Sequence, residues 1–196
     1  MILFLRVRDY KMQMKYKQLS MKDSLSDLLN KSATMIALRQ YFQAHNPDVT
    51  CTFLIMDLDD FKKINDTKGH AAGDTILRMA GLILQDTFQP TDVIGRFGGD
   101  EFIVLLKGVA SRSLIQKKCG TVQMKLRQTS KEMTGIEITS SFGVVSAFGQ
   151  DVDSSAIFYQ ADSVLYEAKR RGKGICVIKD YMPIRSNGEK SQKVHE

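Results

Sequence analysis

Two acidic residues directly follow a pair of glycines in the stretch GRFGGDEFIVLL (95–106), where they stand as Asp100 and Glu101. Another acidic pair, Asp57 and Asp59, ends an apolar run earlier in the chain. Carboxylates that converge repel one another unless a cation lies between them, and oxygen ligands select a hard ion such as Mg²⁺ or Mn²⁺. If the four acids meet, they predict a metal site that acts on phosphates; the alternative is four surface acids that never meet.

The segment DDFKKINDTKGHAAGD (59–74) is dense in polar and small residues. Backbone N–H groups at a turn between a strand and a helix can bind phosphates, and Lys62 or Lys63 would add positive charge. Three further polar side chains could enter the same cleft: Asn65, His70 and Asp74. Taken singly, each of these side chains also suits a helix cap or a turn.

Hydrophobic spacing indicates the elements that must position these groups. It predicts strands at 51–59, 92–97, 101–106, 136–148 and 174–179, and helices at 75–88, 111–132 and 153–171. Gly98 and Gly99 are expected to supply the positive φ values that a tight hairpin turn needs. The order β-α-β-β-α-β, then a helix and a strand, predicts an α+β fold with helices over a mostly antiparallel sheet. The end of the first strand would then lie beside the hairpin turn.

The net charge of +6 and the pI of about 9.2 would suit a nucleic-acid binder, so the location of the charge matters. Residues 1–22 hold six bases and one acid, and residues 181–196 hold three bases and two acids, which leaves 23–180 near neutral. We therefore expect no nucleic-acid partner. Apolar residues three and four apart predict that 1–22 is a basic amphipathic helical arm, either a coiled-coil connector for signalling or a frayed surface helix. Residues 181–196 are expected to be a flexible polar tail.

The three cysteines are widely spaced and form no C-x-x-C motif, which favours free thiols in a reducing compartment. No apolar stretch reaches the roughly 18 residues of a membrane span. We therefore expect a cytoplasmic protein. The apolar start MILFL, followed by bases, could also be the cytoplasmic edge of a truncated membrane anchor, and a sensor domain could precede it.

Several ordered motifs resemble those of the GGDEF domain family, the diguanylate cyclases. They are DSLSDLLNK (23–31), DLDDFKKINDTKGHAAGD (57–74), GGDEF (98–102), TSSFGVV (139–145) and ADSVLYEAKRRGKG (161–174). The resemblance covers about residues 23–180. It implies a palm-like sheet related to nucleotide cyclases and polymerases, and a reaction that condenses two GTP into cyclic di-GMP.

The same resemblance implies the metal chemistry. Asp57 and Asp100 would hold two Mg²⁺ or Mn²⁺ ions with help from the backbone carbonyl of Leu58, and Glu101 would support them. Asp100 or Glu101 would help to deprotonate the attacking 3′-hydroxyl. Because each GTP attacks the other from a facing subunit, the resemblance implies a homodimer.

The resemblance also implies how the nucleotide is bound. The phosphate-binding positions are Lys62, with the backbone of Asp60 and Phe61, and the two bases Lys169 and Lys173. The guanine-binding positions are Asn65 and Asp74, with His70 in the same segment. A carboxylate at Asp74 can accept hydrogen bonds from the N1–H and amino groups of guanine, which adenine lacks, so GTP is favoured over ATP.

Four positions depart from the family's pattern. Asp27 replaces a glycine and Lys31 an arginine, so the helix that leads into the domain is expected to dock differently. Gly174 replaces an asparagine, which is expected to weaken anchoring near Lys173. The inhibitory motif R-x-x-D reads QPTD, so Gln89 stands where arginine is usual and the site with Asp92 is predicted to be non-functional. The metal and guanine positions are intact, which favours an enzyme over a silent module that binds GTP or a cyclic dinucleotide to regulate a partner.

Overall fold

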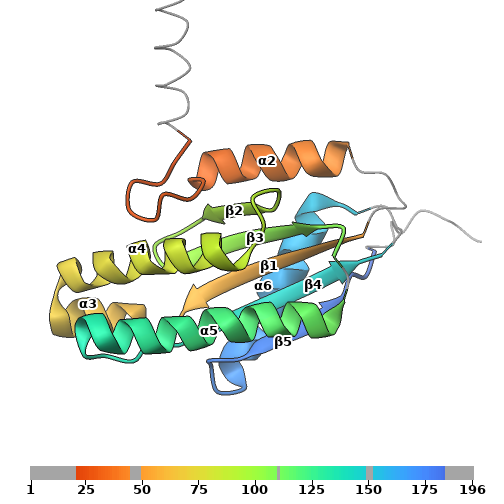
Figure 1. Cartoon of the computed structure of the whole chain (residues 1–196). Helices are drawn as coiled ribbons and strands as arrows, with labels where there is room; N and C mark the ends of the chain where they lie inside the picture. Colours follow the sequence, from red (N-terminus) through yellow and green to blue (C-terminus); the bar gives the residue numbers. More distant parts are fainter. Residues whose placement is uncertain (1–20, 45–49, 110, 149–151, 184–196) are drawn as a thin grey trace, which may run out of the picture.

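The computed structural model describes residues 21–44, 50–109, 111–148 and 152–183 (Figure 1). The predicted arm lies outside these residues except for its last two positions. The predicted tail lies outside them except for 181–183. None of the helices in the described part is long and apolar enough to cross a membrane.

The predicted order of elements is confirmed, with two additions. The chain forms α2 (Lys31–Gln43), β1 (Cys51–Leu58), α3 (Phe61–Lys68), α4 (His70–Thr87), β2 (Val93–Arg96), β3 (Glu101–Lys107), α5 (Arg112–Thr134), β4 (Ser140–Ala147), α6 (Ser154–Arg170) and β5 (Cys176–Asp180). Helix α2 was not predicted, and neither was α3, which occupies the segment expected to be a polar turn. Helix α3 forms because Phe61 and Ile64, three residues apart, share a buried face. Gly69, with φ of 84°, separates α3 from α4.

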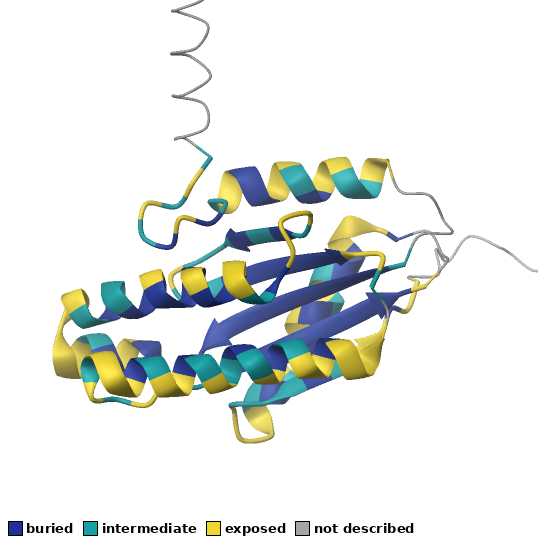
Figure 2. Ribbon diagram, viewed as in Figure 1, coloured by how far each residue is buried: buried dark blue, intermediate teal, exposed yellow. Residues whose placement is uncertain are grey.

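The strands form one sheet in the order β2-β3-β1-β4-β5. The central strand, β1, runs antiparallel to both neighbours, and only the β4–β5 pair among the described strands is parallel. Helices cover both faces, with α4 and α5 on one and α6 on the other (Figure 1). Every residue of β1 and β4 is therefore buried, and the exposed residues gather on the outer sides of the helices (Figure 2).

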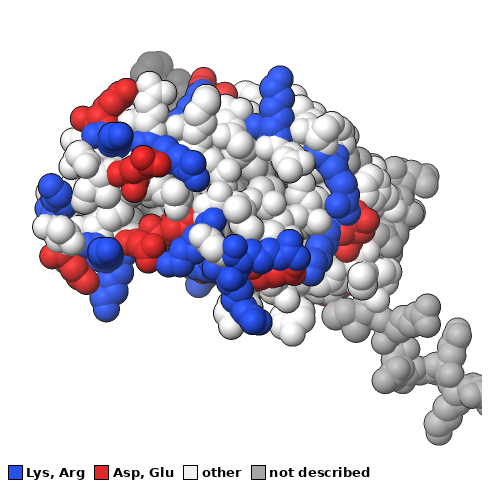
Figure 3. All heavy atoms as spheres, turned by 90° about the horizontal axis from the view of Figure 1, so that it is seen from below, with Lys and Arg blue, Asp and Glu red and all other residues white. Residues whose placement is uncertain are grey.

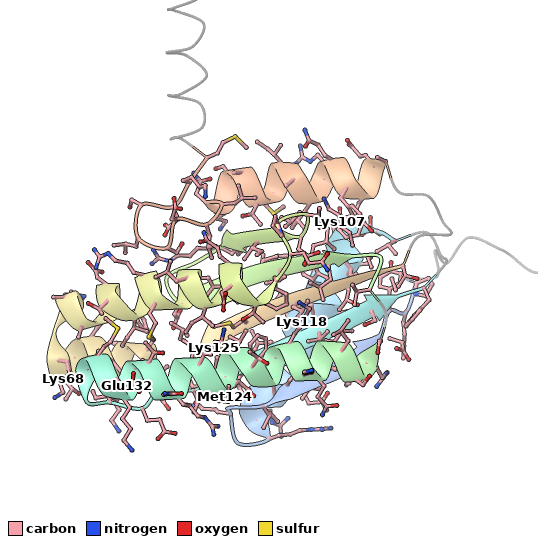
Figure 4. All side chains as sticks on the ribbon, in the orientation of Figure 1. Lys68, Lys107, Lys118, Met124, Lys125 and Glu132 are labelled. Carbon is pink, nitrogen blue, oxygen red and sulfur yellow. The ribbon has the colours of Figure 1, made fainter. Side chains whose placement is uncertain are left out.

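Side chains of β1 alternate between two hydrophobic cores. Leu54 and Met56 pack with α4 and α5, whereas Phe53 and Ile55 pack with α6 and α2. The first core is completed where α5 lies along α4 (Figure 4).

Two lysines join these helices at the surface. Lys118 donates to the carbonyl of Thr87 at 2.6 Å, and Lys125 forms an ion pair with Asp86. Both lysines extend from α5, and both partners belong to α4.

The hairpin between β2 and β3 differs from the prediction in its backbone. Neither Gly98 nor Gly99 is among the described residues with positive φ. The turn closes through the N–H groups of Phe97 and Gly98, which both donate to the carbonyl of Glu101 at 2.8 and 3.3 Å. A Cβ at Gly98 would lie 2.7 Å from Oε2 of Glu101, so the missing side chain leaves room for that carboxylate.

The segment before α2 contacts β2 through an ion pair between Asp23 and Arg96. The carboxylate of Asp23 accepts hydrogen bonds from the backbone N–H of Ser26 at 2.9 Å and from Arg96 at 3.0 Å. Asp27 has φ of 55°, in the left-handed region that glycine occupies without strain. Aspartate is one of the few other residues that tolerate it, so the segment keeps its turn without the family's glycine.

Candidate active site

Asp57 lies near the end of β1, directly opposite Glu101 on β3. The backbone N–H of Leu58 donates to the carbonyl of Asp100 at 3.2 Å, which fixes the strand end beside the hairpin. Burial, with a smaller contribution from the charges of Asp100 and Glu101, raises the pKa of Asp57 to about 6 against the opposing effect of Lys169. The fold therefore brings three predicted acids within electrostatic reach of one another.

The counter-charge at this site comes from α6. The ammonium of Lys169 lies 2.8 Å from Oδ2 of Asp57, and the carboxylate is only 9% exposed. No set of three His, Cys, Asp or Glu among the described residues is gathered closely enough to form a metal cage. The donor chemistry nevertheless fits a hard cation, because a buried carboxylate with a raised pKa beside two further acids gains most from a divalent ion.

The structure differs from the prediction at Asp59. Strand β1 ends at Leu58, and the N–H of Asp59 donates to the carbonyl of Thr139 at 2.9 Å. The carboxylate of Asp59 is buried and accepts three short hydrogen bonds, none from the hairpin: from the hydroxyls of Thr139 and Ser141 and from the N–H of Gly174. It therefore lies toward β4 and the turn before β5.

The predicted phosphate-binding groups gather near the N-terminus of α3. Asp60 precedes the helix with φ of 57° and caps none of its N–H groups with its side chain. The ammonium of Lys173 lies 2.7 Å from Oδ1 of Asp60, and Lys62 is exposed in the first turn of the helix. Basic side chains lie beside acidic ones on the face shown in Figure 3. Free N–H groups and nearby lysines at a helix N-terminus are suited to bind phosphate oxygens.

The predicted guanine-binding residues lie on α3 and α4. The side chain of Asn65 crosses Gly73, where a Cβ would lie 2.0 Å from its Oδ1. Asp74, the next residue, is 44% exposed at its side chain and lies 4.0 Å from Arg78. His70 begins α4 on the exposed side. Sequence reasoning missed the role of Gly73, which depends on how the two helices cross.

The predicted inhibitory site coincides with a cavity of about 380 Å³. Its lining residues are Lys22, Leu28, Leu29, Gln85, Gln89, Pro90, Asp92 and Ile94. The carboxylate of Asp92 accepts N–H groups from Gln89 at 2.9 Å and Lys107 at 3.4 Å. Arg96, the nearby arginine, is bound to Asp23 and to the carbonyl of Gly99, so it does not replace the missing arginine.

Most of the chain matches the model of one protein family. Residues 20–174 match the family model described as diguanylate cyclase, GGDEF domain. The chain belongs to the GGDEF domain family. Diguanylate cyclase DosC of Escherichia coli (strain K12) is 35% identical to this GGDEF domain over 154 residues, or 77% of this chain and 33% of DosC. The chain spans between 24% and 54% of the length of the curated relatives it matches, and about a third of DosC.

Solved structures of GGDEF domains share the fold. The GGDEF domain of DgcB from Caulobacter crescentus, in complex with c-di-GMP, is 25% identical, with a TM-score of 0.73 over 81% of this chain and 95% of that one. The diguanylate cyclase SiaD from Pseudomonas aeruginosa, in complex with its activator SiaC, is 26% identical, with a TM-score of 0.73 over 90% of this chain and 70% of that one. The predicted palm-like α+β fold is confirmed.

Proposed function

We propose that this GGDEF domain is the catalytic part of a diguanylate cyclase, which condenses two GTP into cyclic di-GMP and releases pyrophosphate. The observation that carries the proposal is the buried carboxylate of Asp57 beside Asp100 and Glu101, with Lys169 and the α3 N-terminus next to it. Curated relatives named as diguanylate cyclases support the same activity.

Asp57, Asp100 and the carbonyl of Leu58 would hold two Mg²⁺ or Mn²⁺ ions, with Glu101 in support. When bound, such ions neutralise phosphate charge and favour ionisation of the attacking hydroxyl. Asp100 or Glu101 accepts the proton of the 3′-hydroxyl, whose oxygen attacks the α-phosphorus of the second GTP while the bond to pyrophosphate breaks. Two such attacks close the ring, so two copies of the domain must face each other as a homodimer.

The remaining residues bind and orient GTP. Lys62 and the backbone N–H groups of Asp60 and Phe61 hold phosphate oxygens, and the bases Lys169 and Lys173 bind the terminal phosphates. Asn65 and Asp74 bind the guanine edge, with His70 beside them.

The direct test is incubation of the purified chain with GTP and Mg²⁺, followed by chromatography of the nucleotides. We expect cyclic di-GMP and pyrophosphate, with a specific activity that rises with protein concentration because two domains must meet. Bound GTP without product at high protein concentration would favour the silent module instead.

The contact between Gly73 and Asn65 gives a prediction about GTP binding. In Gly73→Ala the new methyl group must displace Asn65, so we expect the KM for GTP to rise about 10-fold, as for the loss of one hydrogen bond. Thermal unfolding should change little, because the helix preference of alanine over glycine, about 1 kcal/mol, offsets the crowding of Phe61, whose Cζ would lie 3.1 Å from the new Cβ. Gly120→Ala on α5, where a Cβ meets nothing within 4 Å, is the matched control. Unchanged KM values in both variants would contradict the assignment.

A further inference from the structure

The turn between α6 and β5 holds an unusual backbone. Three consecutive residues, Gly172, Lys173 and Gly174, have positive φ values of 121°, 64° and 61°. For Lys173 this conformation is unfavourable, because its Cβ approaches the carbonyl oxygen. Such a conformation persists only where neighbouring groups enforce it.

Within the turn itself the hydrogen bonds are long. The N–H of Gly172 donates to Lys169 at 3.4 Å, and the N–H of Lys173 donates to Ala168 at 3.3 Å. The N–H of Gly174 donates to groups outside the turn, to Oδ2 of Asp59 at 2.9 Å and to the hydroxyl oxygen of Ser141 at 3.2 Å. Of the hydrogen bonds from the N–H groups of these three residues, the one to Asp59 is therefore the shortest.

Asp59 is itself rigidly held. It is 5% exposed, and the hydroxyls of Thr139 and Ser141 donate to its two oxygens, each at 2.7 Å. All three of its side-chain partners are donors, so the site suits a carboxylate, which only accepts. An amide at this position has one acceptor oxygen and no charge, so it would weaken the bond from the N–H of Gly174 even where a hydroxyl turns to accept from its NH₂ group.

Lys173, the middle residue of the turn, extends its side chain toward the start of α3. The ammonium of Lys173 reaches Asp60 at 2.7 Å, at the start of α3 where the phosphates of GTP are proposed to bind. Neighbouring acids therefore hold this lysine in two ways: Asp59 binds the backbone N–H of the next residue, Gly174, and Asp60 binds the side chain of Lys173 itself. Resting on the proposed function, we propose that Asp59 is a positioning residue that holds Lys173 over the phosphate site and takes no part in metal binding.

The first test measures the turn without any turnover. In the full chain, Asp59→Asn is expected to speed amide hydrogen exchange at residues 172–174 by about 10-fold or more, as for loss of a charge-assisted hydrogen bond. Asp162→Asn, which removes an exposed acid on α6, is the matched control and should leave exchange at residues 172–174 unchanged. Unchanged exchange in Asp59→Asn would overturn the proposal. If that variant fails to fold, the pair Thr139→Val and Ser141→Ala should shift exchange in the same direction by less.

The second test asks whether Asp59 acts through Lys173. With a non-hydrolysable GTP analogue and Mg²⁺, Asp59→Asn and Lys173→Ala are each expected to raise the Kd about 10-fold, and the double variant should lose little more. Additive losses would show that Asp59 acts elsewhere and overturn the proposal. Binding and exchange need no product, so a chain that makes no cyclic di-GMP would refute the proposed function without deciding the role of Asp59.

Discussion

Asp57→Asn is expected to abolish cyclic di-GMP formation while raising the stability of the metal-free protein at pH 8. Loss of a metal ligand removes several kcal/mol of transition-state stabilisation, so turnover should fall about 10³-fold or more. The stability of the variant is expected to rise, because burial raises the pKa of this carboxyl in the parent from its ordinary 3.8 to about 6. The folded chain therefore holds the proton more tightly than the unfolded chain. The stability that the protonated Asp57 contributes to the parent is fully present below about pH 4 and is lost as the pH rises through 6.

Asparagine carries no charge for burial to penalise, so the variant should gain roughly 1–2 kcal/mol over the parent at pH 8. Urea unfolding between pH 4 and pH 8, with a chelator present, measures this gain. Glu132→Gln, which removes an exposed acid on α5 (Figure 4), is the matched control and should follow the parent at every pH. If Asp57→Asn unfolds at a lower urea concentration than the parent at pH 8, the carboxylate is stabilising and the assignment of its pKa is wrong.

Gln89→Arg is expected to create product inhibition that the parent lacks. The cavity beside Gln89 and Asp92 provides space, but the parent offers a neutral amide there, and Arg96 is bound elsewhere. An arginine supplies a fixed charge and a planar fork for phosphate or guanine. One such charge-assisted contact changes affinity by about 10- to 100-fold, and the inhibition constant of cyclic di-GMP should fall by that factor.

Initial rates measured at increasing concentrations of added cyclic di-GMP give the inhibition constant of the parent and of each variant. Gln85→Arg, which adds the same charge to the wall of the same cavity, separates a specific contact from a general electrostatic gain. Strong inhibition of the parent at low micromolar product would contradict the prediction, and so would equal gains in the two variants.

Much of this arrangement could be predicted from the sequence, because its signals are local. Alternating and helical spacing placed all five strands and three of the helices. The opposition of Asp57 and Glu101 followed from topology. Helix α3 was missed because only two buried residues, Phe61 and Ile64, mark it within a polar segment.

The predictions about Asp59 and Gly98 were wrong because each depended on a feature that local sequence does not determine. Asp57 and Asp59 are two residues apart, so a continuous strand would place both on one side. Because β1 ends between them, Asp59 turns to donors on β4 and beyond α6, which no local pattern reveals. A positive φ was predicted at Gly98, but the structure shows none there. Instead, its missing Cβ leaves room for the carboxylate of Glu101.

The central place of β1 also bears on how the chain reaches its native state during synthesis. Cys51 pairs with Lys107 on one side and with Ala147 on the other, so both partners are translated long after it. Until then the apolar run CTFLIM has two open edges, each able to pair with a wrong strand. The backbone hydrogen bonds inside helices α4 and α5 are local and can form early, whereas joining β1 to β4 requires the ordering of a long loop. We therefore expect the strand that carries Asp57, although it becomes the centre of the finished sheet, to be among the later parts of the described chain to become fixed.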